Sequence, residues 1–378
     1  MEEPIMQEEP ITQEESLIQE EIDRSAEASP ETLSKAHWHF TMLGLWLVLA
    51  TILFNGMQYL AVFAWKLLKP SLMKDGQAEG IFAYKGFGYW LQLLPTYLIA
   101  VPLILYLGKK LLSGSVPEKR AIKPLQFVAA LACTFGIAIA CNIVGLIITA
   151  ILGKAMGGSV ENVSTQLISS LDPWTSIFLV TIGAPVCEEL IFRKMLVTRT
   201  LKYGEGLSIL LSGLAFGLFH GNFNQFAYAF GIGMFFAYVF VKTGNIKITI
   251  GLHACMNGFT SVVLTNLIQA LDLQKLMEVA SKGLANLQDG NAFADYVQFV
   301  SENGGLIAAV GLCILFEYGF ALFGIIFLLV NLKKIRVNAG EVTIPKGKRF
   351  FIIFCNAGMI AFLVVWIFQI VAQIMGWM

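Results

Sequence analysis

The chain has 378 residues, of which 56% are hydrophobic and only 14% are charged. Soluble domains average about 45–50% apolar and about 25% charged residues, and the mean hydropathy here is +0.69. This composition excludes a soluble globular enzyme, a disordered protein and a disulfide scaffold, and it indicates a membrane protein with many spans. The net charge of zero is the sum of two unlike parts: residues 1–34 carry a charge of −10, and the remainder of the chain carries +10.

The acidic segment 1–36 begins with a six-residue repeat that reads EEPIMQ, EEPITQ and EESLIQ from Glu2 onward. Paired glutamates and prolines leave little apolar area to bury, so the segment is predicted to be a disordered, solvated tail. A tail that binds a cytoplasmic partner is the alternative. The first apolar run starts near residue 40, which argues against a cleavable signal peptide.

The body contains about nine stretches close to the length of about 20 apolar residues that a transmembrane helix needs. We therefore predict an all-α, polytopic bundle of about eight to nine transmembrane helices. It divides into N-terminal spans (37–124), central spans (125–270), an amphipathic loop (271–304) and C-terminal spans (305–378). The candidate spans are 39–65, 87–108, 125–152, 174–197, 205–222, 225–243, 246–270, 305–331 and 350–374.

Lysine and arginine counts predict how the chain is oriented, because basic loops are retained in the cytoplasm. With a cytoplasmic N-terminus, the inner segments hold 19 of these residues and the outer segments hold 7. The chain is therefore expected to be a multi-pass protein of the cell membrane with its N-terminus inside and its C-terminus outside. Four lysines in the first outer loop oppose this assignment. We expect the lipid bilayer as its surroundings and no nucleic-acid partner.

Six cysteines occur in the chain, and none forms a CxxC pair. Most of them lie in apolar runs. We expect buried, small hydrophobic side chains rather than metal ligands or disulfides.

Ionisable groups inside a membrane are costly, so each one is a candidate for function. Glu188 and Glu189 are adjacent in APVCEELIFRKML, and on a helix they point about 100° apart. Arg193 follows Glu189 by four residues, within pairing reach on one helix face. We predict that Glu189 pairs with Arg193 and stays charged, while Glu188 faces a cavity and can act as a general base. Two glutamates that merely mark the inner end of a span are the alternative.

Two histidines also lie inside apolar stretches. His220 follows Phe216 by one helical turn, and Gly213, Gly217 and Gly221 recur at four-residue spacing. Such a stripe of small residues lets another helix backbone approach closely. By itself, this pattern indicates only packing, and a lone buried histidine is more often structural than catalytic.

His253 precedes Asn257 by four residues in HACMN, so both side chains lie on one helix face. Asparagine within a span also joins helices by hydrogen bonds. Taken with the two glutamates and His220, these groups can activate water: a carboxylate accepts the proton, and histidine and amide groups stabilise an oxyanion. The same residue types could hold Zn²⁺, and the sequence does not separate the two mechanisms.

Three motifs in order resemble those of the CPBP family of intramembrane endopeptidases, also called the Abi or CAAX-protease-and-bacteriocin-processing family. They read EELIFR (Glu188 to Arg193), FGLFH (Phe216 to His220) and HACMN (His253 to Asn257). The resemblance covers roughly residues 125–270 and is strongest over 180–260. A single EExxxR would be weak evidence, but three ordered motifs on successive spans are specific.

This resemblance implies an intramembrane endopeptidase that cleaves a membrane-associated peptide or protein. Glu188 is the expected water-activating base, and His220, His253 and Asn257 complete the site. Glu189, Arg193 and Phe216 are expected to support it. If a metal such as Zn²⁺ is present, the same four residues, Glu188, His220, His253 and Asn257, would be its ligands. We favour the account in which the glutamate acts without a metal and no cofactor is needed.

Two other classes of protein remain as alternatives. A transporter or channel would line its path with ionisable residues, and Glu317, in CILFEYGFALF, lies outside the three motifs. A non-catalytic scaffold or bacteriocin-immunity protein is the other alternative. One expectation concerns depth, because a straight helix over 205–222 would place His220 too far outward to meet Glu188. A tilt, a later start or a break in that helix is therefore predicted.

Overall fold

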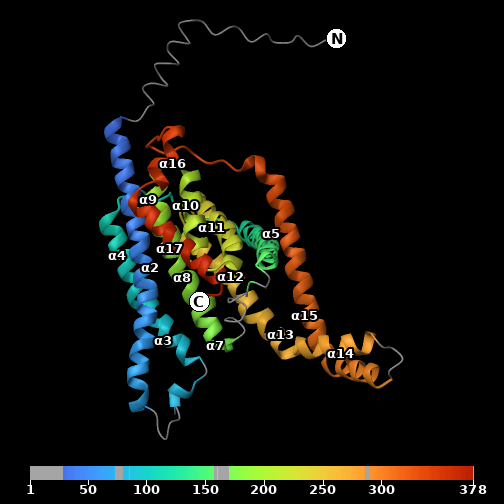
Figure 1. Ribbon diagram of the computed structural model, residues 1–378. Helices are drawn as coiled ribbons and strands as arrows, with labels where there is room; N and C mark the ends of the chain where they lie inside the picture. Colours follow the sequence, from blue (N-terminus) through green and yellow to red (C-terminus); the bar gives the residue numbers. More distant parts are fainter. Residues whose placement is uncertain are drawn as a thin grey trace, which may run out of the picture.

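The computed structural model describes residues 29–72, 80–84, 86–156, 160, 170–285 and 290–377 (Figure 1). Eight helical runs in this part of the chain are long and apolar enough to cross a membrane, and a ninth apolar helix, α10 (Glu205–Leu218), is shorter. The predicted all-α polytopic bundle is confirmed. The eight runs are Pro30–Lys69, Phe87–Leu111, Pro124–Ala155, Pro173–Tyr203, Phe223–Thr243, Ile246–Leu271, Asn291–Lys334 and Ala357–Ile374.

Three runs are built from several helical pieces, including wide π-helical turns. The second run contains α3 (Phe87–Pro95), η2 (Thr96–Ala100) and α4 (Val101–Leu111), and it is preceded by the short η1 (Gly80–Ala83). The fourth contains α7 (Pro173–Thr175), η3 (Ser176–Gly183), α8 (Ala184–Glu189), η4 (Leu190–Val197), α9 (Thr198–Thr200) and η5 (Leu201–Tyr203). The sixth contains α12 (Ile246–Asn257), η6 (Gly258–Leu264) and α13 (Thr265–Leu271).

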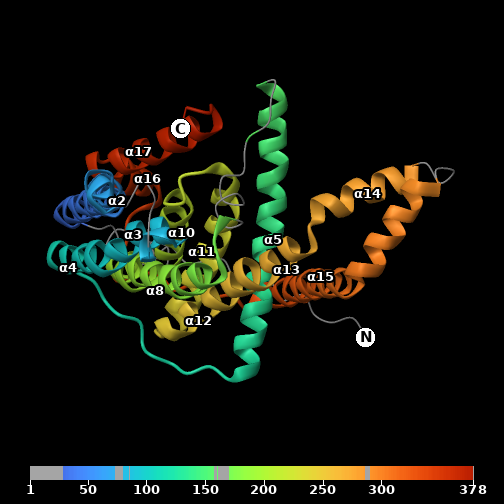
Figure 2. The same cartoon turned by 90° about the horizontal axis from the view of Figure 1, so that it is seen from below.

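The remaining elements frame these runs. Seen from below, α5 passes beside α11 and α15, while α14 lies at the edge of the molecule (Figure 2). The long first helix, α2, lies on the opposite side and packs against α17 (Figure 1). Their bounds are α2 (Pro30–Leu72), α5 (Pro124–Ala155), α11 (Phe223–Thr243), α14 (Leu273–Ala285), α15 (Gly290–Asn331), η7 (Leu332–Lys334), α16 (Lys346–Phe354) and α17 (Ala357–Ile374).

The glycine stripe predicted on α10 does bring two helices together. A Cβ atom built on Gly213 would lie 3.0 Å from the carbonyl oxygen of Phe230, and one on Gly217 would lie 3.1 Å from that of Phe226. Both carbonyls belong to α11, which runs back along α10. Side chains at these two positions would therefore push the helices apart.

Several helix bounds differ from the predicted ones. Helix α2 begins at Pro30, so the end of the acidic segment 1–36 is helical; residues 1–28 lie outside the described residues. The connecting stretch 271–304, whose mixed apolar and charged residues are typical of an amphipathic helix, contains α14 and the first turns of α15 among its described residues. The last span is broken, because Asn356 caps α17 by accepting a hydrogen bond from the amide of Met359. Local capping decided this break more than hydropathy did.

The predicted inner segments meet at one end of the bundle. The amide of Ser115 bonds the carbonyl of Thr198, and the amide of Arg120 bonds that of Thr243. In the same region, Glu205 accepts hydrogen bonds from Asn338 and pairs with Lys242. Four connecting segments, 112–123, 198–205, 243–246 and 335–345, therefore share one basic end, as the span count requires.

The six cysteines are all free in the described part of the chain, but only some are buried as predicted. Cys133 and Cys187 are buried, and Cys141 and Cys313 are partly so. Cys255 and Cys355 are exposed on the surface of the bundle, against the prediction. In a protein that spans a membrane, such apolar side chains can face lipid instead of the protein interior.

Candidate active site

The helical run that begins at α7 carries the paired glutamates. Asp172 caps this run by accepting hydrogen bonds from the amides of Trp174 and Thr175, both at 3.1 Å. The hydroxyl of Tyr84, just before α3, also donates to Asp172. The N-terminal end of the run is thereby fixed to the preceding helices, and α8 then presents Glu188 and Glu189 in the middle of the bundle.

Glu189 and Arg193 form the predicted pair, and both are completely buried. Arg193 Nε lies 3.2 Å from Glu189 Oε2, and the exposed fraction of both side chains is 0%. The guanidinium carbon lies 4.3 Å from the ring centroid of Phe216 and 5.4 Å from that of Phe236. Its terminal nitrogens have no hydrogen-bond partner among the described residues. The two aromatic faces therefore replace hydrogen bonds in holding the cation.

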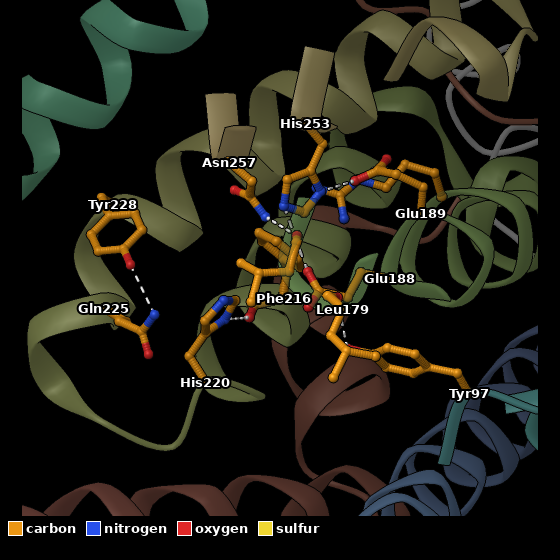
Figure 3. Close-up of polar contacts among 12 residues, drawn as sticks. Tyr97, Leu179, Glu188, Glu189, Phe216, His220, Gln225, Tyr228, His253 and Asn257 are labelled. Carbon is orange, nitrogen blue, oxygen red and sulfur yellow. Dashed lines mark hydrogen bonds and ion pairs between the residues drawn. The ribbon is translucent and has the colours of Figure 1, made fainter. Parts of the chain in front are cut away.

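His253 connects this buried pair to the second glutamate. Its Nδ1 lies 3.1 Å from Glu189 Oε1, and its Nε2 lies 3.8 Å from Glu188 Oε2 (Figure 3). A carboxylate only accepts hydrogen bonds, so Nδ1 carries the hydrogen and Nε2 is the nitrogen that faces Glu188. The side chain of Glu188 is 26% exposed, unlike that of Glu189. Adjacent glutamates thus occupy opposite environments.

The helix that carries His220 is shorter than the predicted span 205–222 and ends before this residue. Helix α10 ends at Leu218, and His220 lies in the turn before α11. Its Nδ1 lies 2.7 Å from the carbonyl oxygen of Phe216, and its imidazole lies within electrostatic range of Glu188 and His253. The ring of Phe216 packs edge-on against both histidines, at centroid distances of 4.9 and 5.8 Å.

Asn257 lies one turn beyond His253 on α12, on the same side of the helix (Figure 3). Its Nδ2 donates to the carbonyl oxygen of Val180 at 3.0 Å. That carbonyl belongs to the π-helical η3, in which each carbonyl pairs with the amide five residues on, and for Val180 that residue is Pro185, which has no N–H. One amide hydrogen of Asn257 is used in this bond, and the second can serve a ligand.

Figure 3 shows Glu188, His220, His253 and Asn257 around one region of the bundle. The structure therefore brings together all four residues predicted to be catalytic, with Phe216, Glu189 and Arg193 packed behind them. Sequence reasoning missed Tyr97, whose hydroxyl donates to the carbonyl oxygen of Leu179 at 3.3 Å. It also missed Phe236, on which Arg193 rests. Neither residue stands out in a sequence rich in aromatic residues.

Glu317 remains apart from this group. It is half-buried on α15, and no hydrogen bond or ion pair joins it to another residue that the structure describes. Phe316 and Phe320, which flank it, pack against Phe259 and Phe135. The contacts of this helix thus give Glu317 no part in the motif cluster.

The donor geometry was tested for a metal site. Within the described ranges, no three His, Cys, Asp or Glu side chains gather as a metal ion would require. The residues as arranged do not fit Zn²⁺, and we derive no chemical step through a metal.

A cavity of about 400 Å³ lies at the basic end of the bundle. The cavity is bordered by Glu118, Arg120, Glu205, Lys242 and Asn338, among others. None of the predicted site residues lines it, so it is separate from the motif cluster.

Comparisons with known proteins agree with this geometry. Residues 170–259 match the family described as Type II CAAX prenyl endopeptidase Rce1-like. The chain is also 27% identical, over 250 residues, to the membrane-embedded CAAX protease MroQ of Staphylococcus aureus (strain USA300), a match that covers 64% of this chain and 97% of that protein. No solved structure was found to match. The family match spans the residues that carry all three motifs, and both comparisons support the resemblance to the CPBP family of membrane proteases.

Proposed function

We propose that this protein is an intramembrane endopeptidase of the CAAX-protease type in which Glu188 activates the attacking water. The observation that supports this most directly is the difference between adjacent carboxylates. Glu189 is completely buried, and Arg193 balances its charge. The side chain of Glu188 is 26% exposed and faces a nitrogen of His253. A general base must reach both water and substrate, and of the two only Glu188 can.

The contacts suggest how the water is held. Nδ1 of His220 carries a hydrogen toward the carbonyl oxygen of Phe216, so its Nε2 is a hydrogen-bond acceptor. In this proposal Glu188 and His220 accept the two hydrogens of one water molecule, which aims its oxygen at the peptide carbonyl carbon. The water oxygen forms the new C–O bond, and its proton moves to Glu188.

The developing oxyanion would be stabilised from the side of α12. The second amide hydrogen of Asn257 donates to it, and His253 joins in once the proton has passed from Glu188 to Nε2, 3.8 Å away. When the intermediate collapses, the C–N bond breaks and the proton is delivered to the leaving amine. The donors are preorganised by Val180 and Glu189, so little reorganisation is needed during the reaction.

The substrate class is proposed from the relatives. The described family is a CAAX prenyl endopeptidase and MroQ is a CAAX protease, so we propose a membrane-associated peptide or protein with a comparable C-terminal sequence. We further propose that the basic end faces the cytoplasm, following the distribution of lysine and arginine.

The test is cleavage of an internally quenched, farnesylated CAAX peptide by the purified protein in lipid nanodiscs. Glu188→Gln should lower kcat by a factor of about 10²–10⁴, the usual contribution of general-base catalysis. Glu317→Gln is the matched control, since it changes a second glutamate in a spanning helix outside the motif cluster, and it should cleave as the wild type does. Wild-type activity in Glu188→Gln would overturn the mechanism.

The same assay addresses the metal. A metal-free mechanism predicts that cleavage continues after dialysis against EDTA. Loss of cleavage on dialysis, with recovery on adding Zn²⁺, would overturn that mechanism.

A further inference from the structure

The C-terminal helix α17 lies outside the residues that match the family, yet it contacts the turn that carries His220. The ring of Trp366 lies 4.8 Å from that of Phe219, and the ring of Phe362 lies 6.1 Å from it. Phe219 immediately precedes His220. A helix from the far end of the chain therefore supports the backbone of a motif residue.

Helix α17 is itself held rigidly by α2. Gly358 is so close to α2 that a Cβ atom there would meet the carbonyl group of Thr41, and Gly44 on α2 is equally close to the backbone of Gly358. Further along, the indole nitrogen of Trp366 donates to the hydroxyl of Thr51 at 3.1 Å. Two fixed points along α17 leave it little freedom to slide, so its contacts can determine the position of the turn.

Two glutamines on the inner face of α17 meet this turn. The side-chain oxygen of Gln373 accepts a hydrogen bond from the amide of Phe223 at 3.3 Å. The amide nitrogen of Gln369 would lie 2.7 Å from a Cβ atom on Gly221, which has a φ of +66°. The residues that flank His220 on its C-terminal side are thus contacted by polar groups from a helix 150 residues away in sequence.

The hydrogen bond from the amide of Phe223 to Gln373 satisfies a donor that has no partner within its own helix. Phe223 is the first residue of α11, and the first amides of a helix have no partner within it. Asn222 caps the amide of Gln225, and its Nδ2 donates to the carbonyl oxygen of His220 at 3.0 Å. The amide of Phe223 is left to Gln373. An unpaired amide at membrane depth is costly, so the turn is best satisfied where Gln373 can reach it.

We propose that Gln373, assisted by Gln369, is a positioning residue that holds the turn so that the His220 imidazole stays beside Glu188. Only the expected effect on cleavage rests on the proposed function. The geometric part, that α17 fixes His220, stands independently. Gln373 acts through the backbone of the turn and does not touch the reacting atoms.

The test compares Gln373→Met, which has a similar size but no acceptor oxygen, with Gln373→Glu, which keeps one. Gln58→Met is the matched control, because Gln58 is also partly buried in a spanning helix, and its one hydrogen bond among the described residues is to the carbonyl of Phe54 on its own helix. Two quantities are measured in nanodiscs: cleavage of the farnesylated CAAX peptide, and hydrogen–deuterium exchange at the imidazole C2 position of each histidine.

Gln373→Met should lower kcat about tenfold with KM little changed, since it misplaces a group without removing a substrate contact. Exchange at His220 should become about fivefold faster, while exchange at His37, His39 and His253 stays the same. Gln373→Glu should restore both quantities, and Gln58→Met should match the wild type.

Wild-type behaviour of Gln373→Met in both measurements would overturn the proposal. So would equally faster exchange at all four histidines, which would indicate general loosening, or failure of Gln373→Glu to restore either quantity. If Gln373→Met does not fold, Gln369→Met is used and must show a smaller change in the same direction, or the proposal is wrong. If the wild type leaves the peptide uncut, the proposed function fails, but exchange at His220 still decides the role of Gln373.

Discussion

The two sides of the candidate site are built in opposite ways. On one side Glu189 and Arg193 are fully buried, and the cation rests on the rings of Phe216 and Phe236. On the other side Glu188 is partly exposed and His220 lies in a turn between helices. The side chains of the buried side have no exposed surface through which they could contact a substrate. On the open side, Glu188 and His220 are accessible to a substrate but have fewer contacts of their own. Their positions therefore depend on neighbouring residues.

His253 is the residue that joins the two sides. One ring nitrogen faces the buried carboxylate and the other faces the open one. The buried pair can therefore orient the imidazole without contacting the substrate. Under the proposed mechanism, the two adjacent glutamates of EExxxR therefore have different roles: Glu189 positions His253, and Glu188 activates the water.

Among changes that would disturb this division between the buried and the open side, Arg193→Met is expected to have the largest effect on stability and activity. Removing one partner of a buried ion pair leaves an uncompensated charge and typically costs about 3–5 kcal/mol of stability. The expected outcome is a protein that unfolds at a markedly lower denaturant concentration and cleaves little peptide. Denaturant titration in detergent micelles, followed by tryptophan fluorescence, measures it.

The double variant Glu189→Met, Arg193→Met is its control. Replacing both charges together should recover most of the stability, because no unpaired charge remains. Activity should stay low, since His253 has lost the acceptor for its Nδ1. Full activity in the double variant would show that the buried pair only supports the fold.

A smaller effect is expected on the side of α12. Asn257→Ala removes the proposed oxyanion donor, and loss of such a donor typically costs a factor of about 10²–10³ in kcat. KM for the peptide should change little, because the amide acts mainly in the transition state. Steady-state kinetics with the farnesylated peptide decide this. A raised KM with unchanged kcat would make Asn257 a substrate anchor instead.

Much of this arrangement could be predicted from the sequence, because it depends on short-range rules. The spans followed from apolar length, and the pairing of Glu189 with Arg193 followed from four-residue spacing on a helix. The grouping of the motifs followed from their order. What these features share is that residues close in sequence, or a single hydropathy profile, determine them.

The rest depended on interactions that a hydropathy profile does not see. The break at His220 occurs where Gly221 adopts a positive φ and Asn222 caps the next helix, and the letters GN inside an apolar stretch were a signal that was not used. The two glutamines of α17, four residues apart in an apolar span, were a second such signal. Pro185, whose missing N–H leaves the carbonyl of Val180 to Asn257, was a third such signal.

The smallest expected effect concerns Gly221 itself and tests whether the open side depends on its turn. At a φ of +66° a side chain is strained, and left-handed backbone costs a non-glycine residue about 1–2 kcal/mol. A Cβ atom here would also displace the amide of Gln369. Gly221→Ala should therefore lower stability by about that amount and reduce kcat, with stability followed by denaturant titration and activity with the farnesylated peptide.

Gly56→Ala on α2 is the matched control, since nothing lies within 4 Å of the Cβ position there. Alanine in place of a helical glycine should raise stability by roughly 0.5–1 kcal/mol and leave kcat unchanged. If Gly221→Ala lost stability but kept full kcat, the turn could shift without moving His220 out of reach of Glu188. Glu188 and His220 would then keep their positions without help from the turn. The two sides of the site would differ only in how exposed their side chains are.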